Sequence, residues 1–257
     1  MSRFGNLEFQ EQPEEFEPQV SGPKDEGFFL GEAQTAFESA DFERALRYFA
    51  RALEFNAQNP GSYGGQVRSL IELGEFAEAE KWAAKALEQF PHDGELLAAR
   101  AVALARQGDL DSAMAYSDAA VEERGNTPYL WLARADVLLA RGEAAAEYCF
   151  EKALAVAHGD WLWHWLAARI RMYYRQFTAA LKLLQAAAEA HAGEFILWLE
   201  LGRCQFALGM SGRAEVSFSR ARELNPSSTA ARLGRVEAHS AGIGARLRGA
   251  WRSLFGR

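Results

Sequence analysis

The stretch WLELGRCQFALGMSGRAEVSFSRARELNP, residues 198–226, decides the fold of this chain. It holds Ala214, a phenylalanine four residues later and a second alanine three residues after that. The first alanine recurs upstream at intervals of 33 or 34 residues, as Ala45, Ala79, Ala113, Ala146 and Ala180. The second keeps the same period, as Ala52, Ala86, Ala120, Ala153, Ala187 and Ala221. A fixed period of this length indicates an array of repeats.

Each repeat contains two stretches with the apolar spacing of a helix, separated by a turn. In the second repeat the pattern predicts helices over about residues 62–73 and 76–90, with Gly74 between them. The same turn holds Gly108, Gly142 and Gly209, and glycine adopts a positive φ there at little cost. Small residues at the helix crossings let backbones approach closely. One helix pair cannot bury its apolar face alone, so neighbouring pairs must stack.

The order Trp198, Leu201, Gly202, then Ala214, Phe218 and Pro226 resembles the tetratricopeptide repeat, which has W-x2-L-G-x2-Y, A-x3-F and P on a 34-residue period. The resemblance covers about residues 26–226. The fifth copy deviates most, because His164 stands in the usual aromatic place and Arg175-Gln176 replaces the turn glycine. The resemblance implies an all-α, right-handed α-solenoid of six helix-turn-helix repeats with a C-terminal capping helix.

Composition restricts the classes of protein that remain. The chain has 257 residues, of which 49% are hydrophobic, and a net charge of −7, which argues against general nucleic-acid binding. Cys149 and Cys204 lie in different repeats and fit reduced, buried thiols better than a disulfide. No apolar run has the length of a membrane span, and the N-terminus has no secretory core, so a cytoplasmic location is expected.

Two segments flank the array. We interpret residues 1–25 as a disordered acidic leader, since seven acidic residues face two basic ones within residues 1–26 and Pro13, Pro18 and Pro23 oppose a helix. Its apolar residues either do nothing or form a docking motif. They are Phe4, Leu7, Phe9 and Phe16.

After Pro226 we predict a capping helix over residues 227–240, a break at Ser240-Ala241-Gly242, and a basic amphipathic helix over residues 241–257. The apolar stripe of this last helix consists of Ile243, Leu247, Trp251, Leu254 and Phe255. Arginines flank the stripe, so it has three possible roles: packing back on the solenoid, docking on a partner, or weak contact with an anionic membrane. The acidic leader could also cover it.

The sequence contains no pattern typical of catalysis. There is no phosphate-binding loop, no nucleophile elbow and no HExxH metal motif. The five histidines never pair at ligand spacing with each other or with a cysteine. We therefore expect no enzyme activity, no cofactor and no metal.

In the family that the sequence resembles, the first helix of each repeat lines the concave wall. Transferring its inward positions to this chain places Gln34, Arg68, Asp136, Arg169, Arg203 and Glu237 in one row. Aromatic and aliphatic residues gather beside this row in the fifth and sixth repeats, a composition typical of interface hot spots. The predicted partner-binding residues are Arg68, Trp165, Arg169, Tyr173, Leu199, Arg203 and Phe206. The alternative is that several of these aromatics belong to the core between repeats.

These features favour a non-catalytic scaffold, adaptor or assembly subunit that holds a peptide or helix of a protein partner in the groove. The alternative is a peripheral membrane or complex-anchoring factor that acts through the C-terminal helix. Cochaperones of the carboxylate-clamp type are disfavoured, because the matching positions hold Leu30, Gln34, Gly65, Glu95 and Ala99 in place of lysines and asparagines. The oligomeric state is left open.

Overall fold

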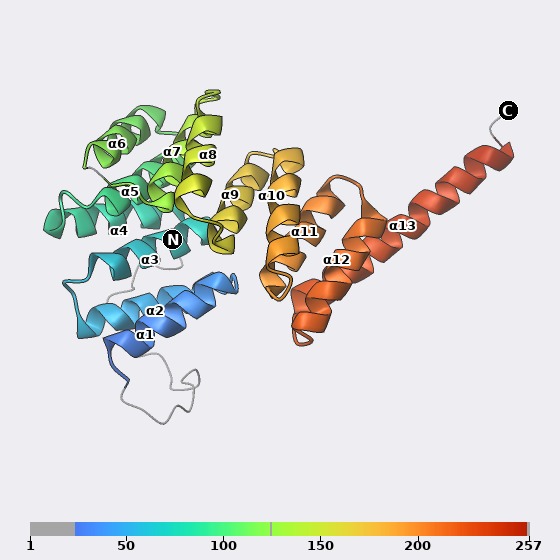
Figure 1. Ribbon diagram of the computed structural model, residues 1–257, viewed down its shortest axis with the longest axis horizontal. Helices are drawn as coiled ribbons and strands as arrows, with labels where there is room; N and C mark the ends of the chain where they lie inside the picture. Colours follow the sequence, from blue (N-terminus) through green and yellow to red (C-terminus); the bar gives the residue numbers. More distant parts are fainter. Residues whose placement is uncertain (1–23, 124, 256–257) are drawn as a thin grey trace. The chain divides into compact units, whose positions relative to one another are not determined.

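The computed structural model describes residues 24–123 and 125–255, with side chains as far as residue 242 (Figure 1). In this part of the chain there are thirteen α-helices and no strand. Their bounds are α1 Glu26–Glu38, α2 Phe42–Phe55, α3 Pro60–Leu73, α4 Phe76–Gln89, α5 Gly94–Gln107, α6 Leu110–Glu122, α7 Pro128–Ala140, α8 Ala146–Val156, α9 Trp161–Tyr173, α10 Phe177–Ala190, α11 Phe195–Ala207, α12 Ser211–Leu224 and α13 Thr229–Phe255. The predicted acidic leader lies outside the described residues except for positions 24 and 25.

The helices form two compact units, of which the first ends at Ala157 and the second begins at His158. Within each unit every helix packs against the next one along the chain, which gives the helix pairs α1–α2 to α7–α8 and α9–α10 to α11–α12, followed by α13. We call the first member of each pair helix A and the second helix B. The predicted all-α solenoid of helix-turn-helix repeats is confirmed.

Consecutive helices A contact each other directly in several places. In the first unit α1 packs directly on α3, α3 on α5 and α5 on α7, and in the second unit α11 packs on α13. No comparable packing joins consecutive helices B within residues 24–123 and 125–255. Because neighbouring pairs come closest along the inner wall of a curved stack, residues on helices A are the ones positioned to face a groove.

The periodic alanines and aromatics form the core between helices. All six alanines that open the pattern, from Ala45 to Ala214, are buried, and so are the six that follow seven residues later. The ring of Phe218 in α12 packs against two helices A at once, because Gly202 of α11 and Gly234 of α13 both face it. A Cβ at either glycine would lie 2.7 Å from this ring. The glycine of the tetratricopeptide pattern has no side chain, and the aromatic ring of the pattern fills the space that this leaves.

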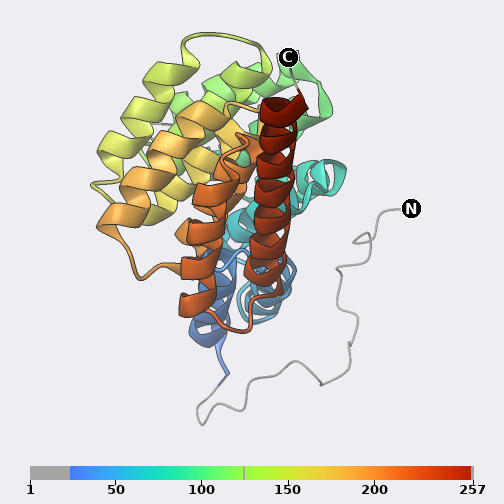
Figure 2. The ribbon, with the colours of Figure 1, turned by 90° about the vertical axis from the view of Figure 1, so that its right-hand side faces the viewer.

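The predicted break at Ser240–Gly242 is wrong, because α13 runs as one helix from Thr229 to Phe255 (Figure 2). α13 lies beside α12 and also contacts α11. Each interior glycine weakens a helix by only about 1 kcal/mol, which is not enough to end it when no proline follows. The predicted capping helix and the predicted amphipathic helix are thus parts of a single element.

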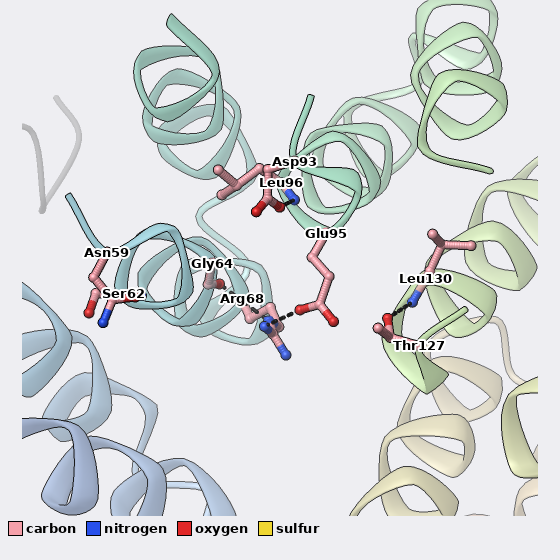
Figure 3. A network of polar contacts seen from close by, with 9 residues as sticks. All are labelled: Asn59, Ser62, Gly64, Arg68, Asp93, Glu95, Leu96, Thr127 and Leu130. Atoms are coloured by element: carbon pink, nitrogen blue, oxygen red, sulfur yellow. Dashed lines mark hydrogen bonds and ion pairs between the residues drawn. The ribbon is translucent and has the colours of Figure 1, made fainter. Parts of the chain in front are cut away.

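Side-chain caps begin almost every helix A, and a short polar residue marks them in the sequence at a fixed period. The N-cap positions recur at 33 or 34 residues, and Figure 3 shows three of them, where Asn59, Asp93 and Thr127 accept the backbone N–H three residues ahead. Asp25 and Ser228 play the same role, and Asp160 accepts the backbone N–H of Leu162, two residues ahead. Short polar side chains at this place satisfy donors that the first helical turn leaves open, so the period marks the helix starts as well as the core.

In every helix pair from α1–α2 to α11–α12, one residue of the turn between helix A and helix B has a positive φ. Gly74, Gly108, Gly142 and Gly209 have φ between 73° and 91°, as the sequence predicted. Two repeats use other residues at this place, namely Ala40 with φ 59° and Arg175 with φ 60°. A left-handed conformation costs a residue with a Cβ about 1–2 kcal/mol, so these two turns carry local strain.

Replacing Arg175 by glycine is expected to raise the free energy of unfolding by about 0.5–1 kcal/mol, because relief of the left-handed strain outweighs the extra entropy of unfolded glycine. Arg175 is exposed, so few contacts are lost. The reciprocal change, Gly142→Arg, is expected to lower stability by about 1 kcal/mol at a turn where a Cβ meets no other atom. Thermal unfolding of both variants checks the pair. Equal melting temperatures would show that the turn conformation is unstrained.

Candidate partner-binding site

A buried carboxylate organises the inner side of the second unit. Glu200 lies in α11 with its side chain only 2% exposed, and its Oε1 accepts hydrogen bonds from Arg169 Nη1 of α9 at 3.0 Å and from Arg203 Nη1 at 2.8 Å. A buried carboxylate requires such partners, since an unpaired one would be strongly destabilising. Glu200 therefore joins two helices A and holds both predicted arginines in place.

The two arginines differ in exposure. The guanidinium of Arg169 lies 5.4 Å from the ring centroid of Trp165, and its side chain is mostly buried. The side chain of Arg203 is 44% exposed, and among the described residues its one hydrogen bond goes to Glu200. Because a guanidinium has five N–H donors, Arg203 keeps most of its donors for groups that approach from solvent.

Two exposed aromatic side chains flank these arginines. Phe206 follows Arg203 by three residues in α11, and Tyr173 follows Arg169 by four residues in α9, so each shares a helix face with its arginine. We call Arg169, Tyr173, Arg203 and Phe206 the arginine–aromatic surface. It combines large rigid rings with a preoriented cation, which is a typical composition of interface hot spots.

Two of the predicted partner-binding residues are not available to a partner. Trp165 is completely buried and Leu199 is 4% exposed. Each lies five residues after the N-cap of its helix. For these two the structure supports the alternative interpretation, that they are core residues between helices.

Arg68 lies in the first unit, whereas the other six predicted residues belong to the second. Figure 3 shows it reaching from α3 to Glu95 at the start of α5, where Nη2 and the carboxylate are 2.8 Å apart. Its guanidinium also lies 4.3 Å from the ring centroid of Tyr129 in α7. Burial raises the pKa of the Tyr129 hydroxyl well above its usual value, although the charge of Arg68 opposes this shift. Arg68 thus ties three helices A together and is mostly buried.

The remaining members of the predicted row have varied environments. Asp136 is buried in α7 and accepts two hydrogen bonds from Arg106 of α5. Gln34 donates to Glu38 within α1, and Glu237 is exposed on α13. The side chains of the predicted stripe on the C-terminal helix, which are Ile243, Leu247, Trp251, Leu254 and Phe255, lie outside the described residues.

The described residues offer little reactive chemistry. Cys149 and Cys204 are free and buried, as predicted, and burial raises the pKa of both thiols, for Cys204 to about 11. The thiol of Cys204 also donates to the carbonyl oxygen of Phe177 at 3.2 Å. No group of three or more possible metal ligands occurs within residues 24–123 and 125–255. Over the same residues, no helix is both long enough and apolar enough to cross a bilayer.

The chain belongs to the tetratricopeptide repeat family. Two family models, both described as tetratricopeptide repeat, match residues 36–103 and 166–229. The two matches fall in different units of the structure, so each unit carries the family pattern by itself. A comparison with curated proteins found no match.

Solved structures share this fold at low sequence identity. A tetratricopeptide repeat protein from Parabacteroides merdae has 17% identity and a TM-score of 0.50, over 85% of this chain and 86% of that one. The APC/C hetero-tetramer Cut9-Hcn1 has 14% identity and a TM-score of 0.50, over 85% of this chain. The human IFIT1 dimer with m7Gppp-AAAA has 19% identity and a TM-score of 0.50, over 88% of this chain. This chain spans 44% of the Cut9-Hcn1 chain and 58% of the IFIT1 chain.

Proposed function

We propose that this protein is a non-catalytic scaffold that holds an acidic and apolar segment of a protein partner on the arginine–aromatic surface. The tetratricopeptide fold supports a protein-interaction scaffold in general. The observation that supports the specific site is the environment of Arg203. Its guanidinium donates a hydrogen bond to the buried Glu200, and the side chain is exposed on the same helix face as Phe206. Anchoring lowers the entropy that the arginine loses on binding, so a partner carboxylate gains more from the contact.

The first step of the test is to capture the partner. A photo-crosslinking amino acid placed at position 206 is expected to capture the partner in extracts of the native cell. The same group at position 216 of α12, where Val216 is 68% exposed, serves as the control. A partner captured from position 216 but not from position 206 would place the binding surface on a helix B.

With the captured partner, Arg203→Ala and Phe206→Ala are each expected to weaken binding by about 2 kcal/mol, which is roughly thirtyfold in Kd. Phe206 is exposed, so Phe206→Ala should change the free energy of unfolding little. Arg203→Ala also removes one of the two hydrogen bonds to the buried Glu200, so its free energy of unfolding is measured beside Kd. Val216→Ala is the matched control and should leave Kd unchanged. Isothermal titration calorimetry at two salt concentrations measures these effects, and salt should weaken the contact made by Arg203. Unchanged affinity in both variants would refute the proposed surface.

Nucleic acid is the competing ligand class, because the IFIT1 structure with m7Gppp-AAAA shares the fold. The net charge of −7 and the pairing of Arg169 and Arg203 with a buried carboxylate favour a protein partner. A single-stranded RNA titrated against the protein is expected not to bind. If the RNA bound and Arg203→Ala abolished this binding, the arginine–aromatic surface would be an RNA site and the proposal would be overturned.

A further inference from the structure

α13 occupies the place of a helix A, but within the described residues no helix B covers the face that a helix B would contact. In α11, Gly202 stands eight residues after the N-cap position and faces the ring of Phe218 in its own helix B. The positions five and eight residues after the cap are buried in the helices A from α5 to α11, whereas the first of them in α1, Leu30, is half-buried. They are Ala98 and Ala101 in α5, Leu132 and Ala135 in α7, Trp165 and Ala168 in α9, and Leu199 and Gly202 in α11. In α13 the same two positions are Leu233 and Val236, which are 51% and 54% exposed.

Nothing within the described residues folds back to cover this face. The A–B turn of the earlier repeats, such as the one at Gly209, would recur near residue 243, but α13 remains helical through that point to Phe255. Along this uninterrupted helix, the spacing from Leu233 and Val236 continues through Ile243, Leu247, Trp251 and Leu254. In the sequence, the apolar spacing that begins at Leu233 and Val236 therefore extends toward Phe255, with an interruption at Ser240.

The charge of α13 indicates what would occupy this face. The helix contains five arginines and one acidic residue, in a chain whose net charge is −7. Arg232 is exposed one helical turn from Val236, and Arg235 has a buried Nε without a hydrogen-bond partner. Neither arginine has an ion-pair partner among the described residues, so carboxylates from outside could satisfy both.

We propose that α13 binds an acidic amphipathic helix of another protein, which sits where a helix B would complete the seventh repeat. A helix fits because in α11 the second of these positions, Gly202, packs against the Phe218 ring of the helix B α12. A second copy of α13 is disfavoured, since two such basic helices would repel each other. The acidic segment at residues 1–23 is disfavoured by Pro13, Pro18 and Pro23, which leave it at most twelve residues without a proline, whereas α12, the preceding helix B, has fourteen. This surface is independent of the arginine–aromatic surface.

The test uses a helix B of this protein as the probe. A peptide with the α4 sequence, Phe76–Gln89, carrying Lys81→Glu and Lys85→Glu and stapled on the face opposite its alanines, is titrated against the full chain. We expect binding that Leu233→Ser with Val236→Ser weakens by at least about tenfold, and that salt also weakens. The peptide with both lysines retained should bind more weakly, because it carries less negative charge. Failure of the acidic peptide to bind would overturn the proposal.

Further variants separate this surface from others. Val216→Ser removes an equally exposed side chain of α12 and should leave binding of the peptide unchanged. Arg203→Ala with Phe206→Ala should also leave binding of the peptide unchanged. The test of α13 can therefore fail without the proposed function failing, and the reverse is also true. Circular dichroism checks that each variant is folded. Binding that is insensitive to Leu233→Ser with Val236→Ser would overturn the proposal.

Three results would assign the α13 face to another occupant and so overturn the proposal. The first is peptide binding that appears only when residues 1–23 are deleted. The second is self-association, measured by sedimentation, that Leu233→Ser with Val236→Ser abolishes. The third is binding to vesicles containing phosphatidylserine that the same variant abolishes while the acidic peptide does not compete.

Discussion

Replacing Asp136 by alanine is expected to lower the free energy of unfolding by about 3–5 kcal/mol. The Asp136 carboxylate accepts hydrogen bonds from Nε and Nη2 of Arg106 at 2.9 and 2.6 Å, and the side chains are 2% and 7% exposed. Since a guanidinium does not lose its proton in a protein, the variant would remove the carboxylate that accepts two hydrogen bonds from this buried charge between α5 and α7. Urea unfolding followed by far-UV circular dichroism measures the loss.

Two further variants show whether burial is the cause. Arg134 and Asp118 form an ion pair between α7 and α6 at 2.8 Å, but Asp118 is 51% exposed, so Asp118→Ala should cost less than about 1 kcal/mol. Replacing the buried pair together, as Arg106→Met with Asp136→Leu, should recover most of the lost stability. Equal losses for Asp118→Ala and Asp136→Ala would contradict the assignment of Arg106 and Asp136 as a buried pair.

Gly65→Ala is expected to lower the free energy of unfolding by up to about 3 kcal/mol. A Cβ at Gly65 of α3 would overlap three atoms of the Phe49 ring of α2, and that ring is itself buried. A loss of stability would be informative, because replacing a glycine inside a helix by alanine normally stabilises the protein by about 0.5–1 kcal/mol. Overpacking must exceed this gain for the protein to be destabilised. Thermal and urea unfolding both measure the change.

The matched control is Gly31→Ala in α1, where a Cβ meets no atom within 4 Å. This variant should be stabilised by about 0.5–1 kcal/mol. When Phe49 is also replaced by alanine, Gly65→Ala should lose its penalty, and a double-mutant cycle isolates the contact. If Gly65→Ala stabilised the protein as much as Gly31→Ala does, the proposed contact between Gly65 and Phe49 would be absent in solution.

The helix boundaries could be predicted because the signals that set them are local. The turn glycines require a positive φ that other residues adopt only with strain, so Gly74 separates the two helices of its repeat, as predicted. The second helix A was expected from about residue 62 and begins at Pro60, because the cap at Asn59 was overlooked. The predicted break at Ser240–Gly242 failed for the same kind of reason, since local glycines weaken a helix without ending it.

The candidate site could be predicted only in part. Arg169 and Arg203 share a surface because they occupy the same place in consecutive repeats, which the period alone specifies. The sequence signal for Glu200 is that it is the single carboxylate within the apolar run Phe195–Leu201. The burial of Trp165 had no local signal, because whether a helix side faces solvent or a neighbouring helix depends on packing between repeats.

The sequence by itself determined the repeat, the position of each turn and the alanine-and-aromatic core, because each follows from backbone preference or side-chain size at a fixed period. Tertiary structure alone decided which polar groups meet. Arg68 reaches Glu95, Arg106 reaches Asp136 and Arg169 reaches Glu200, at separations of 27, 30 and 31 residues. The packing of neighbouring helices likewise decided that equivalent positions are buried in α11 and exposed in α13, since a side chain is covered only where another helix is present to cover it.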